Sequence, residues 1–264
     1  LRRTVLSERA ANEAPSPDTV LGNLKHDVFE AGLRAMDFSR GYLEAAARRV
    51  VSTRRGAESL FATGLSEEEV LHELDAFVAP VTQWGARVAG AAPHGSPVHF
   101  SAGSAPLPVR LERVLGTEEL IVSPMWGLKG KLDATAVWDV GPHARVVTAL
   151  ELKTGHKHRV EHRAQVSLYS LLVADRYDGV PTVGMHDSPC GARPGAAAPA
   201  AKDVAGLLVH VDAKHGAVTS GVMSVHGEIR QLILLRNRLA AAAFAAGGPV
   251  AVPSPDVPSS LAAV

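Results

Sequence analysis

The stretch from Gly127 to Tyr169 carries acidic and basic side chains at a spacing that could hydrolyse phosphodiester bonds. Asp133 ends the run Gly-Leu-Lys-Gly-Lys-Leu-Asp, Glu151 follows 18 residues later, and Lys153 lies two residues beyond. Two carboxylates can share Mg²⁺ or Mn²⁺, which prefer hard oxygen ligands. Such an ion stabilises the charge that builds on a phosphate in the transition state. The lysine could orient the attacking water or stabilise the phosphate as a point charge.

Two predicted strands must bring the acids together. Residues 128–140 and 145–153 alternate like strands and are split by Gly-Pro-His-Ala. With a three-residue turn centred on Pro142, antiparallel pairing sets Asp133 opposite Glu151, and directly opposed residues share a face. A slip of one residue would put them on opposite faces, so the sequence leaves the register open.

A helix predicted over Glu161–Arg176 supplies two more polar side chains. Gln165 and Tyr169 are four residues apart and therefore lie on one helix face. They could position water, the lysine or a substrate phosphate. Basic residues bracket the acids and form a local rim suited to a polyanion such as DNA. These are Lys129, Lys131, Lys157, Arg159 and Arg163.

Each residue also has a structural explanation. An isolated Glu-x-Lys on a strand is usually a solvated face, and Gln and Tyr at helical spacing often form a structural hydrogen bond. His26, in a helix predicted from about Thr19 to Leu33, could be a further metal ligand as a neutral imidazole. A half-buried or surface histidine is the commoner role. The ordered set is what favours a metal nuclease.

The composition of the chain excludes several classes of protein and site. The chain has 264 residues with 27 basic and 27 acidic side chains, so any attraction to nucleic acid must be local. The single cysteine, Cys190, excludes a disulfide framework and a cysteine-cage metal site. No apolar run reaches about 18 residues, so no membrane span is expected. Without a Gly-x-x-x-x-Gly-Lys-Ser/Thr loop, we expect no ATP hydrolysis.

Helices flank the predicted strands, so the expected fold class is α/β with a mixed sheet and an N-terminal helical part. Ser66 and Glu69 form a predicted capping box at the start of a helix that Pro80 should kink. Two further helices are predicted over 39–53 and 228–246, and a hairpin from 204–211 and 217–225. The remaining segments are predicted as a loop or irregular edge over 91–108, a mobile insertion over 179–203 and an extended tail over 247–264.

Four motifs carry a resemblance to a known family. They are Leu-Gly-Asn-Leu-Lys-His26-Asp-Val-Phe, Pro124-Met-Trp-Gly-Leu-Lys-Gly-Lys-Leu-Asp133, Leu150-Glu151-Leu-Lys153-Thr-Gly and Glu161-His-Arg-Ala-Gln165-Val-Ser-Leu-Tyr169. In these the chain resembles the nuclease domain of the eukaryotic DNA replication ATP-dependent helicase/nuclease, in the RecB-like branch of the PD-(D/E)xK superfamily. The resemblance covers residues 1–246, apart from the insertion.

The resemblance implies a restriction-endonuclease-like core and assigns roles to the motif residues. His26, Asp133 and Glu151 would hold Mg²⁺ or Mn²⁺, with the Leu152 carbonyl as a possible extra ligand. Lys153 would be the catalytic lysine, and Gln165 and Tyr169 the supporting catalytic motif.

The implied activity is cleavage of single-stranded DNA, especially 5′ flaps threaded through a tunnel, in Okazaki-fragment processing and DNA end resection. The implied partners are flap DNA, the single-stranded-DNA-binding replication protein A and a C-terminal helicase domain of the same polypeptide. The implied location is the nucleus, with mitochondria as a second site. Alternatives are a RecB-like exonuclease of bacterial repair or CRISPR adaptation, and a catalytically silent DNA-binding domain.

The sequence departs from the family at one feature, the [4Fe–4S] cluster that four cysteines hold in its members. Cys190 lies in the insertion and matches none of those positions. Four thiolates are normally needed, so this chain should hold no such cluster by itself. Either the ligands lie in a longer protein of which this is an excised piece, which we favour, or this homologue lacks the cluster.

Overall fold

The computed structural model describes residues 16–89, 95–100, 105–141, 144–155, 159–177 and 204–245. Its helices are α2 (Pro17–Ala35), α3 (Arg40–Ser52), α4 (Arg54–Thr63), α5 (Glu67–Val88), α6 (Val160–Arg176) and α7 (His226–Ala245). Its strands are β1 (Ser96–Val98), β2 (Leu107–Ser123), β3 (Leu128–Val140), β4 (Ala144–Thr154), β5 (Val204–Asp212) and β6 (Gly216–Met223).

The strands form one mixed sheet in the order β1-β2-β3-β4-β5-β6. All neighbours are antiparallel except β4 and β5, which pair in parallel. A parallel pair needs a crossover connection, and α6 lies in it. The α/β class, the mixed sheet and the N-terminal helical part are therefore as predicted.

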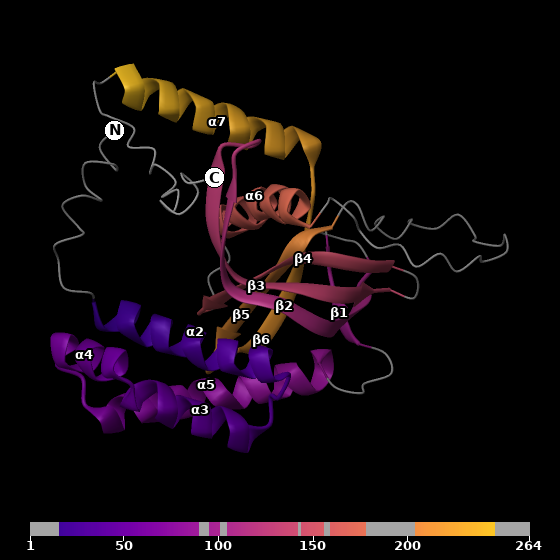
Figure 1. Ribbon diagram of the computed structural model, residues 1–264. Helices are drawn as coiled ribbons and strands as arrows, with labels where there is room; N and C mark the ends of the chain where they lie inside the picture. Colours follow the sequence, from indigo (N-terminus) through magenta and orange to yellow (C-terminus); the bar gives the residue numbers. More distant parts are fainter. Residues whose placement is uncertain are drawn as a thin grey trace, which may run out of the picture. The chain divides into compact units, whose positions relative to one another are not determined.

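The sheet is covered on both faces (Figure 1). Helices α2, α3 and α5 pack on one face over the larger core, which includes Leu150 and Leu152 of β4. Helix α6 covers the other face, where Tyr169 and Leu172 pack against Leu132 and its neighbours. Alternate residues of β4 thus face opposite layers, as a strand requires.

The helix ends follow from local sequence. Ser16 caps α2 by accepting from the backbone N–H of Thr19, and Pro17 takes a first-turn position that needs no N–H. The predicted capping box of α5 is present: Ser66 accepts from the Glu69 N–H, and Glu69 accepts from the Ser66 N–H. Helix α5 runs on through Pro80 to Val88.

Two elements were not predicted, β2 and α4. Strand β2 has register shifts between Leu111 and Arg113 and between Val114 and Gly116, and such bulges break the two-residue alternation that identifies strands. Helix α4 starts from the Thr53 cap directly after α3. The segment 91–108, expected as a loop or irregular edge, contains the short edge strand β1.

The chain divides into two compact units. The larger, Ala14–Ile229, contains the whole sheet and helices α2 to α6. The other joins Leu1–Glu13 to Arg230–Val264, and its described part is α7 from residue 230 onward. The predicted insertion at 179–203 and the tail at 247–264 lie outside the described residues. Within the described ranges, no helix has the length and apolarity needed to cross a membrane.

Candidate active site

The β3–β4 pairing follows the register considered from the sequence as far as Ala134 and Leu150, one step short of the two acids. It runs without a shift from Val140 opposite Ala144 to Ala134 opposite Leu150, so the next step in the register is Asp133 opposite Glu151. At that step Asp133 instead uses its carboxylate: Oδ2 accepts from the Leu152 backbone N–H at 2.7 Å. Asp133 therefore caps the β4 backbone where the two strands stop pairing.

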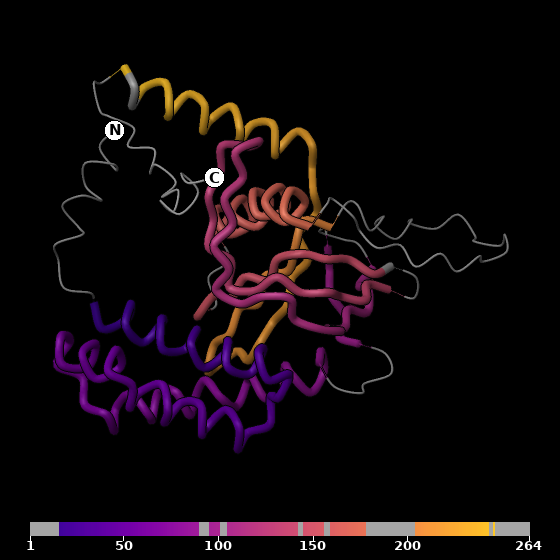
Figure 2. The backbone as a smooth tube through the Cα atoms, in the orientation of Figure 1, coloured from indigo at the N-terminus to yellow at the C-terminus, as the bar shows by residue number. Residues whose placement is uncertain are grey.

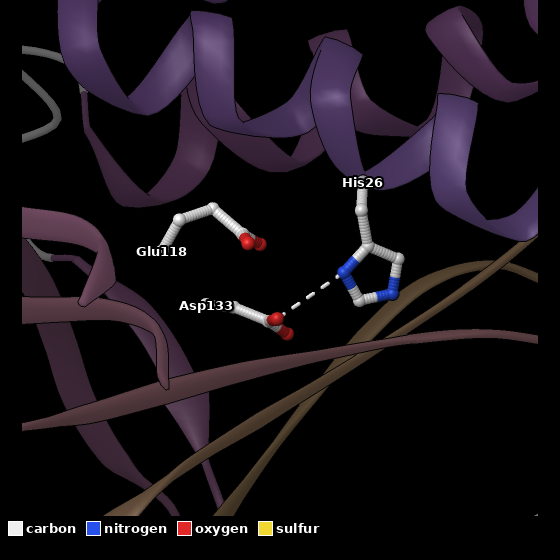
Figure 3. A group of neighbouring side chains, drawn as sticks. All are labelled: His26, Glu118 and Asp133. Atoms are coloured by element: carbon white, nitrogen blue, oxygen red, sulfur yellow. Dashed lines mark hydrogen bonds and ion pairs between the residues drawn. The ribbon is translucent and has the colours of Figure 1, made fainter. Parts of the chain in front are cut away.

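His26 reaches the same point from α2. Its Nδ1 lies 3.2 Å from Asp133 Oδ1 (Figure 3). His26, Glu30 and Arg34 are spaced by four residues along one helix face. Arg34 bonds Glu30 at 2.5 Å and donates from Nε to Thr117 Oγ1 of β2 at 2.7 Å. These bonds tie α2 to the sheet and hold the histidine over Asp133.

Glu151 and Lys153 of β4 belong to a hydrogen-bond network that α6 completes. Lys153 Nζ donates to Glu151 Oε1 at 2.6 Å and to Gln165 Oε1 at 3.1 Å. Gln165 Nε2 donates to Glu151 Oε1 at 2.7 Å and lies 2.8 Å from Tyr169 Oη. The structure thus brings together the acid, the lysine and the two helix residues that the sequence singled out.

One oxygen of Glu151 stands apart from this network. The residue is 3% exposed, yet its Oε2 has no hydrogen-bond partner among the described residues. Burial, and then repulsion from Asp133, raises the pKa of Glu151 from 4.5 to about 7 against the opposing pull of Lys153. A buried carboxylate oxygen without a donor is costly unless a cation or proton satisfies it. The site therefore fits a divalent ion that takes oxygen ligands.

Tyr169 fixes α6 to the strand that carries Asp133. Its hydroxyl donates to the Lys131 carbonyl at 2.7 Å, and burial raises its pKa to about 12, so it stays a neutral donor. The ring lies against Gly130, where an added Cβ would come within 2.7 Å of Tyr169 Cε1 and of Leu172 Cδ1. A larger residue at this position would force these two side chains to shift.

Glu118 joins the site and was missed from sequence. It lies on β2 across from Asp133, between the pairs Thr117–Ala134 and Glu119–Leu132. One ligand atom from each of His26, Glu118 and Asp133 lies within 4.8 Å of the others (Figure 3). If β2 had been predicted, continuing the antiparallel pairing from Ser123 and Leu128 along both strands would have set Glu118 opposite Asp133.

A comparison with family models places the chain among known proteins. The model described as DNA replication factor Dna2 matches residues 1–138, slightly more than half of the 264 residues. The chain belongs to the Dna2 family. Among its relatives are DNA replication ATP-dependent helicase/nucleases of Arabidopsis thaliana (JHS1), 32% identical over 185 residues, and of Mus musculus (DNA2), 31% identical over 189 residues.

The Homo sapiens DNA2 helicase/nuclease is 27% identical over 261 residues and is matched by 92% of this chain. The Arabidopsis and mouse proteins are each matched by 67% of it. This Dna2-family chain spans 14% of the Arabidopsis relative, 18% of the mouse relative and 22% of the human one. It therefore corresponds to less than a quarter of those proteins.

The basic residues that the sequence predicted as DNA contacts differ in exposure and in their ion-pair partners in this Dna2-family chain. Lys129 and Lys131 are exposed on β3, and Lys131 forms an ion pair with Glu118. Arg159 is exposed at the start of α6, whereas Arg163 is paired with Glu228 at 3.3 Å. Lys157 lies outside the described residues. The structure thus places Lys131 next to the acidic group, with Lys129 two residues away on the same strand.

Proposed function

We propose that this chain is the nuclease part of a longer Dna2-family protein and cleaves single-stranded DNA, especially 5′ flaps, in a reaction that needs Mg²⁺ or Mn²⁺. The observation that carries the proposal is the convergence of His26, Asp133 and the unpartnered Glu151 oxygen beside a half-buried lysine, Lys153. The acid–acid–lysine order on two strands followed by a helix supports a PD-(D/E)xK core.

Residues of three elements would hold the ion. Asp133 and Glu151 offer carboxylate oxygens, His26 offers an imidazole nitrogen, and Leu152 offers its carbonyl. A residue in a strand directs its N–H and C=O to the same side. The Leu152 N–H points to Asp133, so its carbonyl faces the same side. When bound, the ion supplies Lewis acidity and lowers the pKa of a water.

The remaining residues position the reacting groups. Lys153 is held by Glu151 and Gln165, so its ammonium is fixed next to the acids and can stabilise charge on the phosphate. Gln165 orients Glu151 and Lys153 together, and Tyr169 anchors α6 to β3. These two act through the residues they hold.

The exposed face of the β2–β3 ribbon is consistent with a single-stranded DNA substrate. Strands β2 and β3 run side by side as a two-stranded ribbon (Figure 2). Cross-strand pairing sets Leu120 beside Lys131 and Val122 beside Lys129, so lysines and exposed apolar side chains share one face. Lysine ammonium groups can neutralise phosphates, and apolar side chains can contact unpaired bases. Glu118 lies two residues from Leu120 on this face, so the ribbon leads to the site.

The longer protein brings further expectations. The relatives' names describe helicase/nucleases. We propose that this protein likewise carries a C-terminal helicase domain and, outside this chain, cysteines for a [4Fe–4S] cluster. Replication protein A as a partner, roles in Okazaki-fragment processing and DNA end resection, and a nuclear and mitochondrial location belong to the same proposal.

Cleavage of a labelled 5′-flap DNA tests the proposal. The wild-type chain should cut within the single strand with Mg²⁺ and not with excess chelator. Asp133→Ala and Glu151→Ala should each slow cleavage by about 100-fold or more, since each removes a group that stabilises the transition state. A flap blocked at its 5′ end should be cut poorly if the strand is threaded. Undiminished metal-dependent cutting by either variant would refute the assignment, and cutting only from free ends would indicate an exonuclease.

A further inference from the structure

Two histidines form a second polar contact between α6 and the sheet, beside the contact that Gln165 makes with Lys153. His210 of β5 is 3% exposed, and its Nε2 lies 3.4 Å from Nδ1 of the half-buried His162 in α6. The ring centroids are 5.6 Å apart, with 36° between the ring planes. In such a pair one ring donates a hydrogen bond and the other accepts it. The contact joins the first turn of α6 to β5.

The two contacts lie side by side in the fold. In the parallel β4–β5 pair, His210 is the register partner of Lys153, and both side chains reach α6. On the helix, His162 and Gln165 are three residues apart, so they are neighbours on its surface. Lys153 Nζ donates to Gln165 Oε1 at 3.1 Å. Any movement of the first turn of α6 at His162 would therefore be passed to Gln165.

The first turn of α6 has weak attachments elsewhere among the described residues. Its N-cap residue, Arg159, makes no side-chain capping bond there. Arg163 pairs with Glu228 at 3.3 Å, but these side chains are 39% and 49% exposed, and exposed ion pairs contribute little. Close packing begins in the second turn, where Val166 lies against Gly206. The histidine pair is therefore the attachment of the first turn that solvent screens least.

We propose that His162 and His210 are positioning residues of the active site. They hold the first turn of α6 on β5 and so fix Gln165, which holds the Lys153 ammonium beside Glu151. This inference rests on the proposed nuclease function and deepens it. Neither histidine has to touch the metal ion or the DNA. A misplacement of about 1 Å can cost about 100-fold in rate, and loss of the pair, which displaces Gln165 without removing it, should cost less.

Cleavage kinetics of the whole chain on labelled 5′-flap DNA with Mg²⁺ test the proposal. His162→Ala and His210→Leu each remove the bond between the rings. Each should lower kcat by about 10-fold and leave KM nearly unchanged, because the lysine acts on the transition state rather than on the bound substrate. His162→Ala changes a half-buried helix position to a good helix former, so this arm does not depend on how well the buried position tolerates leucine.

Tyr177→Phe is the matched control. The Tyr177 hydroxyl donates to Glu119 at 3.0 Å, so this change also removes one bond between α6 and the sheet, but at the other end of the helix. It should leave kcat unchanged. An equal loss of kcat in this variant would show that any loosening of α6 slows cleavage and would overturn the special role of the histidine pair.

A double-mutant cycle with Gln165→Ala separates positioning from general damage to the fold. If the histidines act through Gln165, His162→Ala in that background should change kcat by less than about 2-fold, the usual scatter of independent effects. The same loss in both backgrounds, or an unchanged kcat in His162→Ala alone, would overturn the inference. Either result with an inactive Asp133→Ala would leave the nuclease assignment intact, whereas undiminished cutting by Asp133→Ala would remove the assignment itself.

Discussion

The buried Glu151 side chain holds its proton to a higher pH in the folded chain than in the unfolded chain. Its pKa is raised from 4.5 to about 7, chiefly by burial. Between these pH values the folded state binds more protons than the unfolded state, so the free energy of unfolding should fall as pH rises. The full effect is on the order of 3 kcal/mol, present below pH 4.5 and lost through about pH 7.

Urea unfolding of the wild type and Glu151→Gln, with chelator present, measures this effect. Glutamine has no titrating proton, so the variant should lose the fall in stability between pH 5 and 8 that the wild type shows. Equal pH dependence in the two proteins would mean that Glu151 ionises normally in the folded chain.

Gln165 should affect the cleavage rate through the side chains that it positions. Its amide bonds Glu151 and Tyr169 and accepts from Lys153. Gln165→Ala should lower the cleavage rate by about 10- to 100-fold, the range for groups that orient metal ligands. Ser170→Ala is the control, since among the described residues that hydroxyl bonds only the carbonyl of Ser167 in the same helix. A rate unchanged in both variants would exclude the positioning role.

At the residue scale, sequence spacing was enough to single out Asp133, Glu151, Lys153, Gln165 and Tyr169 as a set, because all lie on one continuous strand–strand–helix segment. His26 was singled out by residue type and resemblance, and the fold supplies its distance from Asp133. Glu118 could not be found, since its nearness to Asp133 depends on the register of the unpredicted β2. Their roles in catalysis and metal binding stay predictions.

At the element scale, the β3–β4 hairpin was predictable because both strands alternate regularly and a short turn separates them. The sequence left the register of the hairpin open, and the structure supplies it. The same reasoning failed for β2, whose two shifts change which residues face the core. The parallel β4–β5 pair could not be derived either, since residues far apart in sequence form it and no local pattern specifies its register.

The packing of α6 on β3 gives a test at this scale. A methyl group at Gly130 would meet Tyr169 and Leu172 at 2.7 Å. Gly130→Ala should therefore destabilise the fold by about 1–3 kcal/mol, the usual cost of overpacking. It should also slow cleavage, because α6 carries Gln165.

Gly41→Ala is the contrasting variant for urea unfolding. Gly41 lies in α3, and an added Cβ would meet nothing within 4 Å. Alanine should stabilise there by about 0.4–1 kcal/mol, since it restricts the unfolded chain. Shifts of stability in the same direction and by similar amounts in both variants would show that close packing at Gly130 is not what holds α6 on β3.

At the scale of the whole molecule, zero net charge means that DNA must be attracted by a local surface. Lys129 and Lys131 lie on the exposed face of the β2–β3 ribbon. Each phosphate contact on a single strand contributes about 0.7 to the slope of log affinity against log salt. The double change Lys129→Gln and Lys131→Gln should lower that slope by roughly 1.4, or 2 × 0.7.

Fluorescence anisotropy with a labelled oligonucleotide, over a range of salt concentrations with chelator present, measures the slope. Arg48→Gln with Arg49→Gln is the matched control, because it removes two exposed positive charges from α3, away from the ribbon. An equal loss of slope in both double variants would show that attraction depends on total charge rather than on this surface.

The claim that everything else depends on is that Asp133 is the centre of a cation site built from α2, β3 and β4. Anomalous diffraction from crystals grown with Mn²⁺ tests it most directly. Strong anomalous density should contact the Asp133 carboxylate and at least one of His26 and Glu151, and it should be lost in crystals of Asp133→Ala. A fully occupied Mn²⁺ elsewhere, with none touching Asp133, would contradict it.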